Sequence, residues 1–240
     1  MSSSLPAVAA AQDQAAIPVM ALIGPPGAGK STAMGTFRRH FPGLVHFGVR
    51  VFFERQTDQG TPIGQRAKYY ADRKIWYPDE LIAEGLAGWL TEILPHASGI
   101  VLESLPRSTA LAIVVDRALG DVGLRVDRVV YLHAPDEVCA DRVMNREVCT
   151  NCDTYVADAI AVPDSACLRC GRQLVRRPDD DPATFHRRLR RLRDGEVDLL
   201  AHYERRGVVV RIDGTRPPSR VVADLEAAAP AALLAATRRA

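Results

Sequence analysis

The stretch GPPGAGKS, residues 24–31, follows directly on the apolar run PVMALI (18–23) and decides the fold. It satisfies the pattern G-x-x-x-x-G-K-[ST], in which glycines allow successive backbone N–H groups to point inward at phosphate oxygens. The helix that follows such a loop turns its positive N-terminal end toward the same anion. A buried strand, this loop and a helix, in that order, therefore predict a binding site for the phosphates of a nucleoside triphosphate.

The side chains that close the loop indicate its chemistry. Lys30 would place a full positive charge at the β- and γ-phosphates, and Ser31 would supply an oxygen to Mg²⁺. The predicted site for ATP with Mg²⁺ also includes Gly24, Gly27, Ala28, Gly29 and Thr32. The loop does not identify the group that receives the phosphate, because switch GTPases, motor ATPases and small-molecule kinases all use it.

Short apolar segments alternate with helical patterns along the rest of the chain. Apolar runs that end at turn residues predict strands at 18–23, 44–47, 99–104, 126–134 and 207–214. Amphipathic patterns and helix-start residues predict helices at 30–40, 78–94, 108–119, 135–146, 182–205 and 218–228. This alternation is typical of a parallel sheet covered on both faces, so we expect a three-layer α/β/α fold. A helical segment (50–77) and a cysteine-containing segment (149–175) do not fit the alternation and are interpreted as insertions.

Composition limits the class of protein. The chain has 240 residues, 47% of them hydrophobic and 25% charged, which is ordinary for a globular domain with one core. A net charge of +2 is too small to argue for nucleic acid or an anionic membrane as a partner, and we expect neither. No apolar run approaches the ~20 residues of a membrane span, and the N-terminus lacks the basic start of a signal peptide. We therefore expect a cytoplasmic protein with reduced cysteines.

Four of the five cysteines have the spacing of a structural zinc site. The ligand set is predicted to be Cys149, Cys152, Cys167 and Cys170, arranged as two C-x-x-C turns. Four thiolates complete a tetrahedral site and leave no coordination position for catalysis. Metal-free thiols and a zinc ribbon that binds nucleic acid are the alternatives, and the small net charge of the module argues against the second. The fifth, Cys139, lies on an apolar helix stripe and is predicted to be a core residue.

Six segments, in order, make the chain similar to the adenylate kinases and their nucleoside-monophosphate kinase relatives. They are GPPGAGKST (24–32), GTPIGQRAKYYADRKIWYPDEL (60–81), ESLPRS (103–108), PDEVCADRVMNR (135–146), RRPDDDPATFHRRL (176–189) and IDGTRP (212–217). The resemblance covers nearly the whole core and implies a P-loop NTPase fold with a helical acceptor-binding insertion and a small zinc lid held by four cysteines.

The resemblance also implies the roles of particular residues. Arg107 would orient the acceptor phosphate, and the transferred and flanking phosphates would be held by Arg142, Arg146, Arg177 and Arg188. Forked guanidinium groups suit this role because each can bind two phosphate oxygens. Glu103 would lie beside Mg²⁺, where the family usually has aspartate, and Arg142 and Gly214 would contribute to the ATP site. Asp179 and Asp180 would orient arginines at the hinge of the lid.

The expected organisation is a single core with two insertions. The core spans 17–228, with an acceptor-binding insertion at 48–77 and a zinc-binding lid at 147–177. Residues 1–16 are predicted to be a disordered lead-in and residues 229–240 a frayed tail. The arginines without an implied role are interpreted as surface charges: Arg187, Arg190, Arg191 and Arg193.

The acceptor site departs from the family pattern. Leu111 stands where adenylate kinases have a glutamine that binds the acceptor adenine, and Phe47 and Val49 replace a threonine and an aspartate. Either Arg50 or Arg55 could bind the acceptor phosphate. Trp76 and Tyr77 replace small aliphatic residues and could simply fill the core.

These observations favour a phosphotransferase that moves the γ-phosphoryl group of ATP·Mg²⁺ to the phosphate of a small-molecule acceptor. AMP is the first candidate acceptor, and another nucleotide or a phosphorylated metabolite is the alternative. We expect a monomer. A nucleotide-dependent switch or ATPase and a catalytically inactive nucleotide sensor are the rival functions, each predicted to act without an acceptor.

Overall fold

The computed structural model describes residues 17–149, 166–167, 170–177 and 179–237. The predicted lead-in, much of the predicted lid and the last three residues therefore lie outside the described part of the chain.

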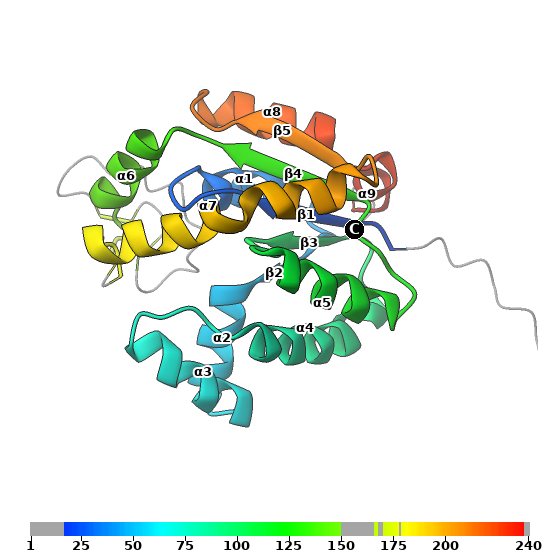
Figure 1. Ribbon diagram of the computed structural model, residues 1–240, viewed down its shortest axis with the longest axis horizontal. Coiled ribbons are helices and arrows are strands. Elements are labelled where there is room, and N and C mark those ends of the chain that lie inside the picture. Colours follow the sequence, from blue (N-terminus) through cyan, green and yellow to red (C-terminus); the bar gives the residue numbers. More distant parts are fainter. Residues whose placement is uncertain (1–16, 150–165, 168–169, 178, 238–240) are drawn as a thin grey trace, which may run out of the picture.

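The described chain is built on a parallel sheet (Figure 1). Its five strands, in the order β2-β3-β1-β4-β5, are β1 (Val19–Ile23), β2 (Val45–Gly48), β3 (Ile100–Glu103), β4 (Arg128–His133) and β5 (Val209–Asp213). All neighbouring strands pair in parallel. Every residue of β1 and β3 is buried, as expected for central strands covered on both faces.

Helices form the outer layers. They are α1 (Lys30–His40), α2 (Val49–Asp58), α3 (Pro62–Asp72), α4 (Asp79–Ile93), α5 (Thr109–Gly120), α6 (Asp136–Asn145), α7 (Pro182–Glu204), α8 (Pro218–Ala228) and α9 (Ala231–Thr237), with a 3₁₀ turn at Leu94–His96. The predicted core strands and helices are therefore confirmed, with ends that shift by one or two residues.

Alternation along β1 separates two apolar cores, one on each side of the sheet. Val19, Ala21 and Ile23 belong to a cluster with α4, α5 and the end of α7, while Met20 and Leu22 belong to a cluster with α1, α8 and the start of α7. The three-layer α/β/α prediction is confirmed by this arrangement.

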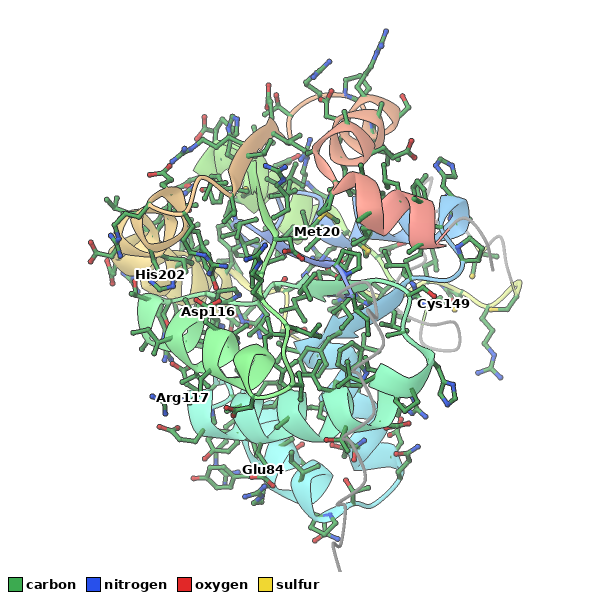
Figure 2. All side chains as sticks on the ribbon, turned by 90° about the vertical axis from the view of Figure 1, so that its right-hand side faces the viewer. Met20, Glu84, Asp116, Arg117, Cys149 and His202 are labelled. Atoms are coloured by element: carbon green, nitrogen blue, oxygen red, sulfur yellow. The ribbon has the colours of Figure 1, made fainter. Side chains whose placement is uncertain are left out.

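Polar contacts join the C-terminal end of α7 to α5. Figure 2 labels two of the residues involved, His202 and Asp116. His202 Nε2 lies 2.8 Å from Asp116 Oδ2, and Arg206 contacts the same carboxylate at 3.2 Å. α7 is thereby held at its C-terminal end, and its N-terminal end extends toward the phosphate loop (Figure 1).

The helical segment predicted at 50–77 consists of α2 and α3, which lie beyond one edge of the sheet (Figure 1). The side chain of Thr61 accepts a hydrogen bond from the backbone N–H of Gly64 and so caps α3, which explains why α3 begins there. At the base of the lid, Val148 and Val175 form an antiparallel bridge, as do Ala166 and Gln173.

The C-terminal tail differs from the predicted frayed end. Residues 231–237 form α9, and Leu233 is fully buried in the same core as α1 and α8. Pro230 ends the preceding helix but does not prevent a new one, because Leu233 gains an apolar site. Within the described residues, none of the helices has the length and apolar character needed to cross a bilayer.

Candidate active site

A cavity of about 1130 Å³ lies at the carboxyl ends of the strands, where ligands of open α/β folds bind. Its walls come from the phosphate loop, the start of α2, the α3–α4 connection, α6, the lid base and α7. Its cationic lining is Lys30, Arg50, Lys74, Arg107, Arg142, Arg146, Arg177, Arg188 and Arg216. The cavity is therefore suited to a ligand, or a pair of ligands, with several negative charges.

The phosphate loop has a backbone that only glycine accepts at two points. Gly24 has φ of 141°, and a Cβ there would lie 2.1 Å from the carbonyl oxygen of Leu132. Gly27 has φ of 88°, and a Cβ there would lie 2.4 Å from the carbonyl oxygen of Cys139. Gly29 precedes α1 without a side-chain cap, so the first N–H groups of α1 remain available to an anion. The remaining predicted loop residues line the same cavity: Ala28, Ser31 and Thr32.

Lys30 is buried at the centre of this loop. Its Nζ donates hydrogen bonds to the carbonyl oxygens of Gly24 and Pro25, each at 2.8 Å. Burial lowers the pKa of Lys30 to about 8, and the neighbouring Arg146 acts in the same direction. A phosphate bound in the loop would supply the negative charge that this ammonium group lacks.

Glu103, at the end of β3, faces the loop. Ser31 Oγ donates to Glu103 Oε1 at 2.6 Å, and His46 Nε2 lies 3.0 Å from Oε2. Burial alone would raise the pKa of Glu103, but His46, Ser31 and Lys30 together lower it below its ordinary value. Because a hydroxyl and a carboxylate meet at the cavity wall, their oxygens match the ligands that Mg²⁺ prefers.

Arg107 lines the cavity and lies against an aromatic side chain. Its Nη2 donates to the carbonyl oxygen of Tyr77 at 2.6 Å, and its guanidinium lies 4.5 Å from the ring centroid of Trp76. Asp79, at 4.0 Å, is its nearest carboxylate. Burial lowers the pKa of Arg107 to about 10, and the nearby carboxylate of Asp79 acts in the opposite direction.

Arg142 and Gly214 meet in the cavity wall beside the phosphate loop. Arg142 Nη1 donates to the carbonyl oxygen of Gly214 at 2.7 Å, across the space above the phosphate loop. Both residues line the cavity. Arg216 and Pro218 extend the same wall.

Arg146 and Arg177 differ in how they are paired. Arg146 forms a two-pronged ion pair with Asp180, with both N···O distances at 2.5 Å. Arg177 Nε, by contrast, is buried and has no hydrogen-bond partner among the described residues. Burial lowers the pKa of Arg177 to about 10, helped by repulsion from Arg146 and Arg50. Arg177 is thus a cation poised for an anionic ligand.

Asp179 bridges two arginines of the cavity wall, Arg50 in α2 and Arg188 in α7. Its Oδ2 lies 2.9 Å from Arg50 Nη1 and 2.9 Å from Arg188 Nη1. Burial would raise the pKa of Asp179, but the two guanidinium groups hold it well below its ordinary value. Arg188 Nε is buried without a partner in the described part of the chain, so Arg188 also retains capacity to bind an anion.

The structure distinguishes the two arginines left open by the sequence. Arg50 lies in the first turn of α2 and lines the cavity, whereas Arg55 lies farther along α2 and is exposed outside it. Of these two arginines, Arg50 is therefore the one that could contact a ligand in the cavity.

The departures from the family pattern have two different consequences. Leu111, in α5, and Phe47, in β2, are buried in the apolar core that also contains side chains of α4. Neither residue lines the cavity. Val49, Trp76 and Tyr77 line the cavity, so the two aromatic residues are not only core filling. The part of the cavity near Arg107 is consequently bounded by apolar and aromatic walls as well as by arginines.

Three of the arginines interpreted as surface charges make specific contacts. Arg191 lies 4.8 Å from the ring centroid of Trp76, Arg187 donates to the carbonyl oxygen of Lys74, and Arg193 bridges Asp136 and Glu196. Arg187 and Arg191 are exposed, as the surface interpretation predicts, although each also contacts the α3–α4 connection. Arg193 is only partly exposed and is held by its two ion pairs. The spacing of Arg193 and Glu196, at i and i+3 on one helix, is a local signal for their ion pair. The other partners lie far away in the chain, so sequence alone could not locate them.

The cysteines of the lid converge. The Sγ atoms of Cys149, Cys167 and Cys170 lie within 4.8 Å of one another, and Cys149 and Cys167 are buried. The separation between the Sγ atoms of Cys149 and Cys170 is 3.5 Å. Thiols gathered at this spacing fit a tetrahedral zinc ion. The fourth predicted ligand, Cys152, lies outside the described residues. Cys139 is buried in α6, as predicted.

A parallel α/β sheet that carries a P-loop beneath a wall of inward-facing arginines defines a nucleotide kinase of the P-loop class. Comparison with known proteins identifies the family within this class. The family model described as "Adenylate kinase" matches residues 22–208. The chain therefore belongs to the adenylate kinase family, whose members are ATP-dependent phosphotransferases.

Curated relatives agree along nearly their whole length. The chain is similar to an adenylate kinase of Symbiobacterium thermophilum, with 33% identity over 210 residues, covering 86% of this chain and 96% of the relative. It is 31% identical over 207 residues to an adenylate kinase of Syntrophomonas wolfei, covering 85% and 95% respectively. An adenylate kinase of Salinispora tropica is 33% identical over 201 residues, covering 82% and 91%.

Proposed function

We propose that this protein transfers the γ-phosphoryl group of ATP·Mg²⁺ to the phosphate of a small-molecule acceptor, with AMP as the first candidate. An oxygen of the acceptor phosphate attacks the γ-phosphorus, the bond to the bridging β–γ oxygen breaks, and ADP leaves. The observation that carries this proposal is the placement of Lys30, Arg107, Arg177 and Arg188 around one cavity, where the Nε atoms of the last two arginines are buried without partners in the described chain.

At the donor end, the loop N–H groups and Lys30 would hold the β- and γ-phosphates, with Arg142 and Gly214 beside the rest of ATP. Ser31 and Glu103 would bind Mg²⁺, directly or through its water. Arg146, Arg177 and Arg188 would neutralise charge on the migrating group, since this reaction depends on positioning and electrostatic stabilisation.

At the acceptor end, Arg107 and Arg50 would bind the acceptor phosphate. Arg50 would exchange the carboxylate of Asp179 for the phosphate, since the two anions are chemically similar acceptors for a guanidinium. The walls formed by Val49, Trp76 and Tyr77 supply apolar contact and stacking rather than a dense set of base-edge hydrogen bonds. A different nucleotide or a phosphorylated metabolite is therefore the alternative acceptor.

The cysteine cluster supports a structural zinc ion in the lid. Cys149, Cys152, Cys167 and Cys170 would hold it, and the ion would replace an apolar core in a segment too small to build one. Closure of the lid would exclude water and so suppress hydrolysis of ATP.

We also infer that the protein acts as a monomer in the cytosol, without nucleic acid or membrane partners. One chain supplies both ends of the cavity, so no second subunit is needed to complete it. The cytosol provides ATP and keeps zinc-binding thiols reduced.

The test is a coupled assay of ADP release from ATP with a panel of monophosphates: AMP, GMP, CMP and UMP, with Lys30→Met as the inactive control. The expected result is ADP release that depends on one or more acceptors and falls by about 100-fold or more in the control. ATP hydrolysis that is unaffected by every acceptor would instead favour the switch or ATPase interpretation and overturn the proposal.

A further inference from the structure

The pair formed by His46 and Glu103 is a feature that the proposed roles do not yet use. The two side chains are almost fully buried, with side-chain exposures of 4% and 6%, and their closest atoms are 3.0 Å apart. A buried carboxylate is strongly destabilising without partners, so one that persists beside a ligand cavity is held there by specific contacts.

Strand register brings the two residues together. β2 and β3 pair with His46 opposite Val101 and Gly48 opposite Glu103. Side chains two positions apart on a strand share a face, so His46 lies diagonally across from Glu103 within reach of a long side chain. Gly48, directly opposite Glu103, has no side chain, and both residues line the cavity.

The two contacts to Glu103 constrain different oxygens. Ser31 donates to Oε1 at 2.6 Å and His46 donates to Oε2 at 3.0 Å. His46 must act as the donor because an ionised carboxylate can only accept. A glutamate has one more rotatable bond than the aspartate usual in this family, and the hydrogen bond from His46 removes the extra freedom. Each oxygen keeps a second lone pair that can face the cavity.

We propose that His46 is a positioning residue for the magnesium site: it fixes the carboxylate of Glu103 so that Mg²⁺ bound with the nucleotide meets a preorganised ligand. The proposal rests on the proposed function only in taking ATP·Mg²⁺ as the ligand. Residues that orient a metal ligand typically change metal affinity by ~10- to 100-fold when they are replaced.

The test measures how Mg²⁺ changes nucleotide binding, with no acceptor present. Titration calorimetry of the full-length protein with a non-hydrolysable ATP analogue, in EDTA and across a series of Mg²⁺ concentrations, separates affinity for the nucleotide from affinity for the metal. His46→Leu removes the donor at similar volume, and His46→Gln keeps an N–H donor near the position of Nε2. His96→Gln is the matched control, because His96 is exposed in the 3₁₀ turn away from the cavity.

Mg²⁺ is expected to raise the affinity of the protein for the analogue. For His46→Leu, the Mg²⁺ concentration that gives half of this increase should rise by about 10-fold or more. Affinity for the analogue in EDTA should stay within about 2-fold, His46→Gln should recover most of the loss, and His96→Gln should match the wild type. An unchanged Mg²⁺ dependence in His46→Leu, or equal losses with and without Mg²⁺, would overturn the proposal.

If His46→Leu does not fold, His46→Asn decides the question. Asparagine keeps a polar group but is too short to reach Oε2, so its Mg²⁺ dependence should weaken while that of His46→Gln does not. Equal behaviour of the asparagine and glutamine variants would contradict a positioning role. These binding measurements remain decisive even if no acceptor is ever phosphorylated, so failure of the proposed function would be recognised separately.

Discussion

The carboxylate of Asp179 lies 2.9 Å from Nη1 of Arg50, although the two residues are 129 positions apart in the sequence. The contact joins α2, on the acceptor side of the cavity, to the segment that leads from the lid into α7. Because Arg188 contacts the same carboxylate, an anion already bridges the two guanidinium groups before any phosphate arrives. The free site is therefore preorganised for the phosphate that would bind between them.

Replacing Asp179 tests how much this bridge stabilises the fold. Asp179→Asn is expected to lower the free energy of unfolding at pH 7 by ~1–2 kcal/mol, because two guanidinium groups lose their shared anion. The folded-state pKa of Asp179 is lowered, so its contribution is present above the ordinary value of 3.8 and is lost as pH falls below it. Urea unfolding at pH 7 and pH 3 should therefore show a smaller difference between wild type and variant at pH 3. A difference that is the same at both pH values would contradict this assignment.

Lys30 gives a pH dependence to nucleotide binding. With its pKa lowered to about 8 by burial, the free protein loses the positive charge above that pH, while bound phosphates restore it. The dissociation constant for ATP should therefore rise above pH 8, approaching about tenfold per pH unit, with uptake of a proton on binding. Calorimetry at pH 9 in two buffers of different ionisation enthalpy measures that proton. Lys30→Arg, which stays charged, is the control, and an affinity independent of pH from 7 to 9.5 in the wild type would refute the prediction.

Arg177 is predicted to support turnover without stabilising the fold. Its guanidinium is partly buried with an Nε that lacks a partner in the described chain, so Arg177→Met should leave the free energy of unfolding unchanged or raise it by ~1 kcal/mol. Turnover should fall by about 100-fold, because a cation that stabilises the transferring phosphoryl group is lost. Arg146→Met is the contrasting variant: it strands Asp180, whose side chain is 1% exposed, and should cost ~2 kcal/mol. Full activity in Arg177→Met would contradict the proposed role.

The cysteine cluster predicts one bound zinc ion per chain. Cys167→Ser should abolish zinc retention, measured by elemental analysis of the purified protein, and should reduce hydrogen-exchange protection in residues 170–177. Affinity for ATP should change little, while acceptor-dependent turnover should fall because the lid no longer closes as a unit. Cys139→Ser is the control, since Cys139 lies in α6 outside the cluster. Wild-type protein that contains no zinc, and whose unfolding is unaffected by chelators, would rule the site out.

Local signals were enough to predict the phosphate loop and the order of strands and helices. Each depends on residues close together in sequence: an apolar run, a glycine turn and a helix start. Local signals do not distinguish Arg50 from Arg55. That choice depends on α2 beginning at Val49, which places Arg50 in the first turn beside the cavity. One or two residues of shift in a helix end are enough to reverse such an assignment.

Contacts between distant elements account for the rest of what the sequence could not predict. The pair of His46 with Glu103 spans 57 positions and depends on the register of two parallel strands. Arg191 resembles any solvated charge on an arginine-rich helix, and only the packing of α7 over the α3–α4 connection brings it to Trp76. The C-terminal helix was missed because burial of Leu233, rather than propensity near a proline, stabilises it.

Trp76 should report on acceptor binding by fluorescence. The chain has two tryptophans, and Trp89 packs on Phe47 with ring centroids 5.1 Å apart, so Trp89→Phe leaves Trp76 as the single reporter. Because the Arg107 guanidinium lies 4.5 Å from the Trp76 ring centroid, a phosphate that binds Arg107 must change the environment of the indole. We expect a saturable emission change with AMP, little change with an ATP analogue alone, and no change with AMP in Arg107→Met. Trp76→Leu should raise the KM of the acceptor by ~5-fold, at the loss of one cation–π contact, while the KM of ATP stays constant. An equal response to both nucleotides, or equal shifts in both KM values, would show that Trp76 belongs to the shared structure of the cavity rather than to its acceptor end.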